Sequence, residues 1–469
     1  MRPKFDWKRF LPALAAIAVP VALQNLLATT AGMVDTMMIA PLGQTTVGAI
    51  GLCAQFSSLL FAGYWGFVGG GMLFYGQYWG AKDDSGIDRT YGITTLCLMT
   101  VAFTFTGFAI FAPELVMRMY TDKESIREIG ISYLRIVGFS YPLTVYSVGM
   151  SALLRSTERV KIPLIASICS VLTNVGLNYC LIEGHFGFPA MGVEGAALAT
   201  VCAAFVNAAV MLVLAKIAGY PYLFHFARHF KWDAEYLKLY FSRCFPILCN
   251  EVLIGTGFMI TNIVLGRQSE NAIAAIAVFR TFEGFVISFF SGFTSAASVL
   301  VGKPVGAGEL DTAYERAKRL VYLCGATILA LCLLIFSIHA PLLRKMSLRG
   351  ESFSICRQML AAYCVIAVIR MCNWMQNDTY RAAGDAAYGT ILEIAFMYAM
   401  VIPCLFAAWR LFNAPFLIVF LCCYIDEPVR FALMQMHLYS GKWIKPVTEQ
   451  GRLALSAFRE NRRKKETFA

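Results

Sequence analysis

Four polar residues in the first half of the sequence lie within long apolar segments, where they could bind a small cation. They are Asp35, Asn174, Asn178 and Thr200. Asn174 and Asn178 are one helical turn apart, and all four groups are predicted to lie roughly 6 to 13 Å below the outer membrane edge. Carboxylate, amide and hydroxyl oxygens at one depth could hold H⁺ or Na⁺, and for Na⁺ the metal ligands would be Asp35, Asn174 and Asn178. Alternatively, Asp35 is an interfacial residue and the asparagines bond between helices.

A second polar group lies in the second half, at greater depth. Glu251, Glu283 and Arg370 are all predicted to lie roughly 18 to 22 Å from the outer edge. Two acids and one base could neutralise one another as a structural network. Alternatively, Glu251 titrates or meets a cationic substrate while Arg370 tunes its pKa, which would place these residues in a substrate cavity or gate.

The segments that must position these residues are apolar enough to cross a membrane. Hydrophobic residues make up 58% of the 469-residue chain and charged residues 15%, and the mean hydropathy is +0.62. Typical soluble domains have about 25% charged residues, and a membrane helix needs roughly 20 mostly apolar ones. We therefore predict an all-α polytopic membrane protein. Its twelve transmembrane helices are expected at about 11–39, 48–79, 91–112, 130–154, 161–183, 192–216, 240–266, 272–300, 318–339, 355–380, 388–410 and 414–438.

The sequence repeats itself at a fixed spacing. Five residues reappear 226 positions later, namely Pro20, Gly76, Gly80, Ala81 and Arg155 as Pro246, Gly302, Gly306, Ala307 and Arg381. An ungapped repeat predicts two copies of one unit, and six spans per copy make both copies enter from the same face. We expect two six-helix bundles related by a pseudo-two-fold axis along the membrane normal, with a cavity between them. Pro20 and Pro246 fall within the first span of each bundle, where the missing N–H permits a helix kink.

Lysine and arginine residues predict the orientation. They gather in the N-terminus, in the predicted inner loops and in the C-terminal tail, whereas the predicted outer loops hold few. Both termini are therefore expected to be cytoplasmic, and the net charge of +11 requires no nucleic-acid partner. The predicted parts are an N-terminal lobe (1–216), a cytoplasmic connector (217–239), a C-terminal lobe (240–438) and a basic cytoplasmic tail (439–469). The connector is expected to be an interfacial helix or an ordinary ordered loop.

Other kinds of site have little support in the sequence. The 15 cysteines are scattered without paired CxxC spacing, and none of the 5 histidines has a partner at metal-ligand spacing. Hydrolase, kinase and P-loop motifs are absent from the sequence. We therefore expect no catalytic residues, no cofactor and no enzymatic activity.

Several segments together resemble the multidrug and toxic compound extrusion (MATE) family of cation-coupled transporters, across almost the whole chain. They are MVDTMMIAPLG (33–43), GQYWGAKD (76–83), GFPAMGVEGAALAT (187–200), FPILCNEV (245–252), VGKPVGAGEL (301–310), TYRAAGD (379–385) and SGKWIKP (440–446). The resemblance implies two six-helix bundles that alternate between inward and outward openings. It also implies efflux coupled to the entry of H⁺ or Na⁺.

The resemblance assigns roles to individual residues. Asp35 stands at the family's first-helix acid, Pro20 at the proline of that helix, and Glu251 at the seventh-helix acid. Asn174, Asn178 and Thr200 match positions around the N-lobe cation site. Some members have an aspartate where Asn178 stands, so the local charge is smaller in this chain. Others have an acid where Arg370 falls, and the arginine here argues against a C-lobe cation site built on paired acids. The N-lobe site is therefore the candidate for coupling, and Glu251 with Arg370 is the candidate cavity or gating pair.

These observations lead to the hypothesis of a secondary antiporter in the cell membrane. It would export organic cationic or amphipathic compounds by alternating access, in exchange for H⁺ or Na⁺. Its expected partners are a small-molecule substrate and the lipid bilayer, with no nucleic acid, and a monomer is expected. The alternative is a flippase of lipid-linked saccharide or another lipid, which needs a strongly cationic cavity. Arg280 and Arg370 favour that alternative, whereas Glu251 and Glu283 oppose it.

Overall fold

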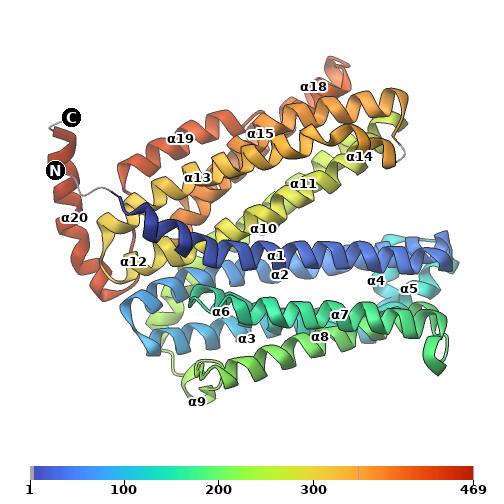
Figure 1. Cartoon of the computed structure of the whole chain (residues 1–469), viewed down its shortest axis with the longest axis horizontal. Coiled ribbons are helices and arrows are strands. Elements are labelled where there is room, and N and C mark those ends of the chain that lie inside the picture. The colour runs from blue at the N-terminus through green and yellow to red at the C-terminus, as the bar shows by residue number, and fades with distance from the viewer. Residues whose placement is uncertain (1–4, 347, 468–469) are drawn as a thin grey trace. The chain divides into compact units, whose positions relative to one another are not determined.

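The computed structural model describes residues 5–346 and 348–467, and this part of the chain is helical without a β-strand (Figure 1). The first ten helices are α1 (Trp7–Ile39), α2 (Gln44–Ala81), α3 (Asp84–Phe111), α4 (Pro113–Tyr120), α5 (Glu124–Val137), α6 (Ser140–Ser156), α7 (Lys161–Glu183), α8 (Gly192–Ile217), α9 (Phe226–His229) and α10 (Ala234–Leu265). The second ten are α11 (Glu270–Ala297), α12 (Lys303–Gly306), α13 (Leu310–Ser337), α14 (His339–Lys345), α15 (Gly350–Ala382), α16 (Tyr388–Phe396), α17 (Ile402–Phe406), α18 (Phe416–Cys422), α19 (Glu427–Ser440) and α20 (Glu449–Thr467). Short 3-10 or π turns lie at Ala40–Leu42, His185–Gly187, Ser298–Gly302, Met397–Val401 and Ala407–Leu411.

Most of the predicted spans correspond to long apolar helices. Within the described residues, ten helical segments are long and apolar enough to cross a membrane, so the chain is a multi-pass membrane protein. The fourth predicted span consists of α5 and α6, which meet at a bend of 51° and would make an eleventh. The last predicted span, 414–438, is divided into α18 and α19 by residues 423–426.

The chain forms two compact units. Unit 1 comprises Met1–Ala18, Gly76–Asp83 and Phe241–Ala469, and unit 2 comprises Val19–Tyr75 and Asp84–Tyr240. The units therefore contain most of the predicted C- and N-terminal lobes, respectively. Helix α1 passes from one unit to the other next to Pro20, one of the two predicted kink positions.

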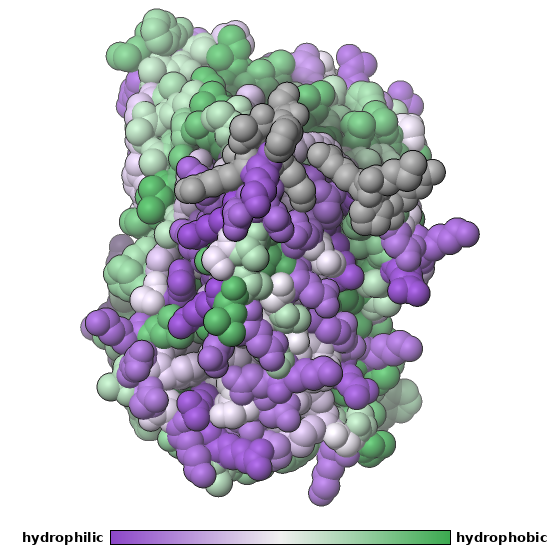
Figure 2. Space-filling model, turned by 90° about the vertical axis from the view of Figure 1, so that its left-hand side faces the viewer, coloured by the Kyte–Doolittle hydropathy of each residue, from purple (hydrophilic) through white to green (hydrophobic). Residues whose placement is uncertain are grey.

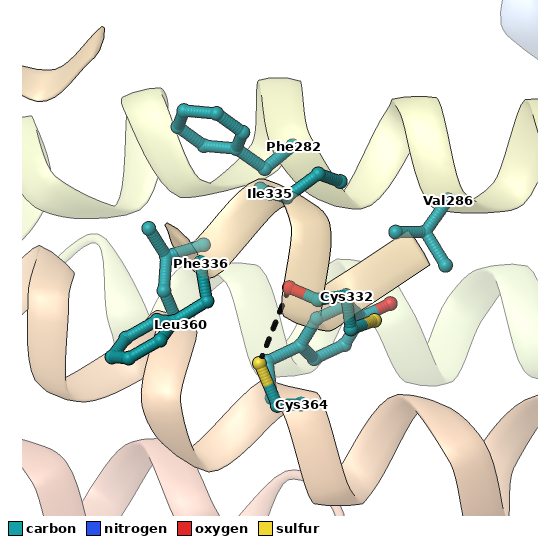
Figure 3. A pocket seen from close by; sticks show the side chains of 8 residues that line it. Phe282, Val286, Cys332, Ile335, Phe336, Leu360 and Cys364 are labelled. Atoms are coloured by element: carbon teal, nitrogen blue, oxygen red, sulfur yellow. Dashed lines mark hydrogen bonds between the residues drawn. The ribbon is translucent and has the colours of Figure 1, made fainter. Parts of the chain in front are cut away.

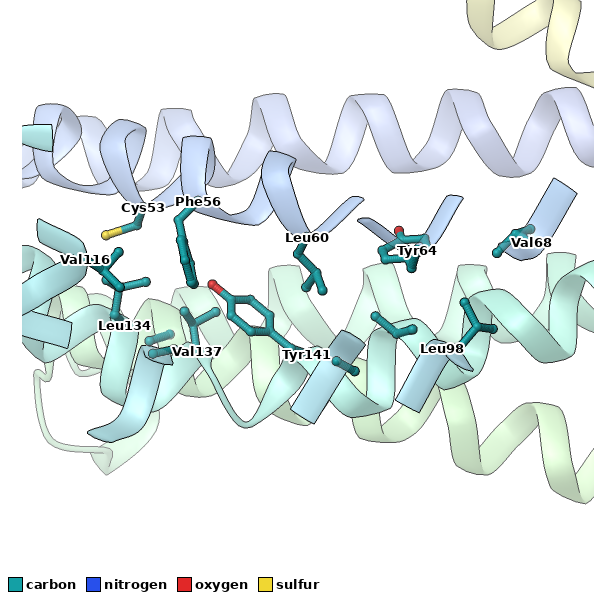
Figure 4. Close-up of a cluster of buried hydrophobic side chains, with 14 of the residues drawn as sticks. Cys53, Phe56, Leu60, Tyr64, Val68, Leu98, Val116, Leu134, Val137 and Tyr141 are labelled. Atoms are coloured by element: carbon teal, nitrogen blue, oxygen red, sulfur yellow. The ribbon is translucent and has the colours of Figure 1, made fainter. Parts of the chain in front are cut away.

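Unit 2 has an apolar core in which α2, α3, α5 and α6 pack together (Figure 4). Phe56 and Leu60 of α2 lie near Tyr141 of α6, and Leu98 of α3 extends the same cluster. The Tyr141 hydroxyl lies 3.2 Å from the Ser57 hydroxyl, so this polar group in the core is hydrogen-bonded.

Unit 1 contains a close helix crossing that follows the sequence repeat. A Cβ atom on Gly80 would lie 1.9 Å from the carbonyl oxygen of Lys303, and one on Gly306 would lie 1.9 Å from the carbonyl oxygen of Gln77. Gly80 is equivalent to Gly306 in the repeat, and Gln77 is equivalent to Lys303. The two contacts are therefore related by a two-fold operation, which is the arrangement expected for an isologous contact. Only glycine permits this backbone approach.

Residues 441–448, the C-terminal strap, follow α19 and are packed against this crossing. The amide of Val447 donates to Gln77 Oε1 at 2.8 Å, and the hydroxyl of Thr448 donates to the carbonyl oxygen of Gly306 at 2.8 Å. Trp443 of the strap is completely buried. The predicted basic tail therefore begins as an ordered segment and continues as α20. Hydrophilic side chains cover much of the face that carries α20 (Figure 2).

An ionic contact fixes the other side of the strap. Lys445 Nζ lies 2.9 Å from Asp385 Oδ1, and His437 Nε2 lies 3.1 Å from Asp385 Oδ2. Burial alone would raise the pKa of Asp385, but the hydrogen bonds from His437 and Lys445 outweigh it and hold this pKa below its usual value. Asp385 belongs to the loop between α15 and α16.

The connector predicted at 217–239 lies against α3 in unit 2. It contains the single-turn helix α9, and its last residues already belong to α10, which begins at Ala234. His225 Nδ1 lies 3.0 Å from the buried carboxylate of Asp88, and the Tyr222 hydroxyl donates to Asp84 at 2.5 Å. These contacts favour the ordered loop over the longer interfacial helix.

Candidate functional site

Asp35 and the two asparagines predicted to accompany it meet inside unit 2. Asp35 lies near the end of α1 and is half-buried, whereas Asn174 and Asn178 lie on α7 and are buried. The Asn178 Nδ2 atom donates to Asp35 Oδ1 at 2.6 Å and to Asn174 Oδ1 at 3.4 Å. One amide group therefore links the carboxylate to the second asparagine.

Thr200 lies on α8 and contacts this group indirectly. Its hydroxyl donates to the carbonyl oxygen of Ala196, 3.0 Å away and one turn earlier. Tyr133 of α5 interacts with Thr200 through its hydroxyl and electrostatically with Asp35. Tyr133 is absent from the sequence prediction, because a tyrosine on an apolar helix gives no signal that separates it from a packing residue.

The oxygen atoms around Asp35 fit a small hard cation. In the part of the chain that the structure describes, the Asp35 carboxylate has no ion-pair partner. The Asn178 Oδ1 atom is buried there without a hydrogen-bond partner. The Asp35 carboxylate could therefore take up a proton delivered by water, and the water could donate a hydrogen bond to Asn178 Oδ1. Alternatively, both oxygens could coordinate Na⁺. Carboxylate and amide oxygens are ligands that hard cations prefer.

The two prolines at which kinks are predicted lie in equivalent helices of the repeat. Pro20 is inside α1 and Pro246 is inside α10. Just before Pro20, a Cβ atom on Gly292 of α11 would lie 2.3 Å from the carbonyl oxygen of Ala18, so α1 and α11 are in close contact there. Whether either proline kinks its helix remains a prediction.

Glu283 and Arg370, two of the three deep charges predicted in the second half, form a buried ion pair in unit 1. Arg370 Nη1 lies 2.5 Å from Glu283 Oε1, and Arg280 Nη1 lies 2.5 Å from Glu283 Oε2. The Arg370 guanidinium also lies 4.6 Å from the ring centre of Trp374. Glu283 therefore bridges two arginines, one on its own helix α11 and one on α15.

Glu251, the third predicted charge, has another partner. Its nearest base is Arg381, whose Nη1 lies 4.0 Å from Glu251 Oε1 and 3.9 Å from Asp378 Oδ1. The predicted pair of Glu251 with Arg370 is not formed among the described residues, because Arg370 is engaged with Glu283. Depth along the membrane normal, on which the prediction rested, does not specify the direction in which a side chain points around its helix.

The contact of Arg381 follows the sequence repeat. In unit 2 the equivalent residue, Arg155, donates to Gln24 Oε1 of α1 at 2.8 Å. Gln24 is equivalent to Asn250, the neighbour of Glu251. The fourth predicted span of each half (α6 and α15) thus directs an arginine toward the first span of the same half (α1 and α10), and in the second half that arginine meets an acid.

Further charges that the sequence prediction omitted surround Arg430 of α19. The closest acids are Glu427 at 2.8 Å, Asp426 at 3.4 Å and Glu393 of α16 at 3.7 Å. The sequence could have indicated this cluster, because Asp426, Glu427 and Arg430 are three charged residues inside one predicted span, 414–438.

A pocket in unit 1 is apolar and small. It has a volume of about 10 Å³ and lies between α11, α13 and α15, where Phe282, Phe336 and Leu360 line it (Figure 3). Its Cys364 thiol donates to the carbonyl oxygen of Cys332 at 3.6 Å. A cavity of this size holds at most about one water molecule, so it is a packing defect and not a substrate site.

Comparison with known proteins gives a consistent result. The MatE family model matches residues 20–180 and 246–407, two segments whose starting points are one repeat length apart. The probable multidrug resistance protein YoeA of Bacillus subtilis is 24% identical over 439 residues, covering 91% of this chain and 92% of its own length. The probable multidrug resistance protein NorM of Thermotoga maritima is 23% identical over 455 residues, covering 94% and 95%.

Solved structures share the fold. A crystal structure of MATE in complex with MaL6 superimposes with a TM-score of 0.82 at 18% identity, covering 92% of this chain and 96% of the other. An outward-facing multidrug resistance MATE family transporter of the MOP superfamily gives a TM-score of 0.82 at 17% identity, with the same coverage.

Proposed function

Because the chain belongs to the MatE family, whose members are transporters, we propose that it is a secondary antiporter that exports organic cationic or amphipathic compounds in exchange for H⁺ or Na⁺. Relatives named as multidrug resistance proteins support this substrate class. We further propose that it acts as a monomer in the cell membrane, with both termini in the cytoplasm.

The observation that carries the proposal is the environment of Asp35. This carboxylate is half-buried, has no basic partner among the described residues, and accepts a 2.6 Å hydrogen bond from Asn178. A charge at membrane depth without a counter-charge is costly, so binding H⁺ or Na⁺ there is favourable. Cation binding would weaken the charge-assisted bond from Asn178 and release α1 from α7.

Coupling through this site has sufficient driving force. When the exported compound is uncharged, one cation that enters across 100 mV supplies about 2.3 kcal/mol, which supports a substrate gradient of about fifty-fold. A one-for-one exchange with a monovalent organic cation moves no net charge, so the H⁺ or Na⁺ gradient drives it, at about 1.4 kcal/mol for each tenfold difference in ion concentration. In the proposed cycle, a cation enters from outside at Asp35 and substrate leaves by alternating access. Glu251, which lies 4.0 Å from Arg381, would then meet the cationic substrate or form a gate together with this arginine.

The charge of the C-terminal half favours a cationic substrate over an anionic lipid. Among the described residues, ion pairs join four arginines, Arg280, Arg370, Arg381 and Arg430, to six acids, Glu251, Glu283, Asp378, Glu393, Asp426 and Glu427. A flippase of lipid-linked saccharide would need the opposite balance, so we retain it only as the alternative.

Drug accumulation in cells that express Asp35→Asn tests the proposal. We expect the variant to lose export, because asparagine cannot exchange a proton or supply a charged ligand. Glu183→Gln is the matched control, since this acid lies on α7 with Asn178 but its side chain is 57% exposed. Unimpaired export by Asp35→Asn at every pH and Na⁺ concentration would refute the coupling role of Asp35.

A further inference from the structure

The break in the last predicted span places a helix N-terminus inside unit 1. Helix α18 ends at Cys422 and α19 begins at Glu427, about midway along the predicted span 414–438. A helix N-terminus carries a partial positive charge, and transporters commonly build ion sites at such breaks. The side chain of Asp426, which precedes α19, does not cap the helix.

Three acids converge on one arginine next to this break. Arg430 lies 2.8 Å from Glu427, 3.4 Å from Asp426 and 3.7 Å from Glu393. All four residues are buried, with at most 8% of their surface exposed. Arg430 can compensate one negative charge, so this group depends on a further cation for neutrality.

The neighbouring charges leave one carboxylate unmatched. Arg370 Nε lies 3.9 Å from Glu427, but Arg370 is bound more closely to Glu283, which also pairs with Arg280. The connected group therefore has four carboxylates and three guanidinium groups. An unmatched buried charge is so costly that a group in this position takes up a proton instead.

Polar atoms on the adjacent face of α15 lack partners. Asn373, Gln376 and Asn377 follow the spacing of one helix face and are at least 94% buried. Asn373 donates to Glu427 at 2.7 Å and Asn377 to Glu393 at 3.4 Å. The Oδ1 atoms of both asparagines, and both amide atoms of Gln376, have no hydrogen-bond partner among the described residues. Each unpaired group costs about 1–3 kcal/mol, and buried water is the usual way in which proteins satisfy such groups.

Arg430 contacts the three acids at different distances, and Glu393 is the most distant of them. Glu427 has the shortest contact with Arg430, and Asp426 has the next shortest. Glu393 lies in the middle of α16, and its contacts are the longest of the three. The other charged or titratable groups near this cluster are Arg280, Glu283, Arg370, Asp378, Arg381, Tyr424 and Glu251.

We propose that Glu393, Asp426, Glu427 and Arg430 form a hydrated proton-binding site inside the C-terminal half, in which the three carboxylates share one proton. A proton fits better than Na⁺, because the Arg430 guanidinium already contacts the same carboxylates and would repel a metal ion. The use of this proton in transport rests on the proposed antiport, but its binding is a property of unit 1 itself.

Infrared spectroscopy of the purified chain in lipid nanodiscs tests the proposal. The Asp35→Asn variant is the parent, so that the signal does not depend on whether Asp35 couples transport. Near neutral pH, adding Glu393→Gln should remove the band of one protonated carboxyl group from the parent spectrum. Adding Asp88→Asn instead should leave the band unchanged, since Asp88 is another completely buried acid but pairs with His225 at 3.0 Å. If Glu393→Gln does not fold, Glu427→Gln should also remove the band, because it removes the surplus carboxylate.

Transfer to D₂O tests the hydration. The band should shift after brief exposure of the folded protein, because water reaches the site. An unshifted band would mean that the site is sealed, and an unchanged band in the folded glutamine variants would mean that no proton is held there. Loss of the parent band on addition of Na⁺ would assign the site to a metal ion. Each of these three results would overturn the proposal.

Discussion

Replacing Arg370 with methionine should strongly destabilise the protein, because the substitution removes one side of a buried ion pair. Arg370 and Glu283 are 5% and 3% exposed, and their closest atoms are 2.5 Å apart. In Arg370→Met, Glu283 would keep the ion pair with Arg280, whose side chain is 40% exposed, and a hydrogen bond from the Tyr424 hydroxyl at 3.3 Å. Removing one partner of a buried pair typically costs about 3–5 kcal/mol.

The double variant Arg370→Met/Glu283→Leu separates the pair from simple packing. Replacing both partners with apolar residues of similar volume is often neutral or stabilising. We therefore expect the double variant to recover at least about 2 kcal/mol relative to the sum of the two single variants, which lies in the range measured for directly coupled residues.

Unfolding in mixed micelles with increasing denaturing detergent, followed by tryptophan fluorescence, measures these differences. A loss of about 3 kcal/mol changes the unfolding equilibrium by about a hundred-fold. Arg410→Met is the control, because this arginine is exposed and lies over the ring of Trp409 at 4.5 Å, so its loss should change stability by less than about 0.5 kcal/mol. Additive losses in the double variant would refute the coupling between Glu283 and Arg370.

Two further predictions concern the crossing and the strap. Gly306→Ala should lower the free energy of unfolding by at least about 1–3 kcal/mol, because its Cβ would lie 1.9 Å from a backbone oxygen. The control Gly284→Ala should not lower it, because a Cβ at Gly284 would have nothing within 4 Å. Equal melting temperatures of the two variants would contradict the close crossing. Asp385, held by His437 and Lys445, has a lowered pKa, so its contribution to stability is complete above its usual pKa of about 3.9 and is lost as the pH falls through the lowered value. The stability difference between wild type and Asp385→Asn should therefore be constant near neutral pH and shrink in acid, and a difference that grows on acidification would contradict this assignment.

Much of the architecture was accessible from the sequence. Apolar length predicted most of the spans, because a membrane helix needs a continuous apolar segment. The repeat identified Gly80 and Gly306 as equivalent residues, and the two make equivalent close contacts, although the crossing itself was not predicted. The grouping of Asp35 with Asn178 followed from their common depth, and the 2.6 Å hydrogen bond between them agrees with it.

Other features could not be predicted from the sequence. Depth placed Glu251 beside Arg370, but the direction of each side chain around its helix is not encoded in depth, and Arg381 is the partner instead. The break before α19 was not predicted, because the strongly hydrophobic residues of α18 made 414–438 resemble one continuous apolar span. The C-terminal strap is held by individual hydrogen bonds to distant residues such as Gln77, which accepts from Val447, and such contacts leave no periodic pattern in the sequence.

The most direct measurement of the central claim is ion-driven dye transport in liposomes. The wild-type protein and Asp35→Asn would be reconstituted with a cationic dye, and a pH or Na⁺ gradient would be imposed across the membrane. Our account predicts that the gradient drives dye against its concentration in the wild type but not in Asp35→Asn, while dye-for-dye exchange without a gradient persists in both. Equal gradient-driven accumulation in the two proteins would contradict a coupling role for the acid of α1.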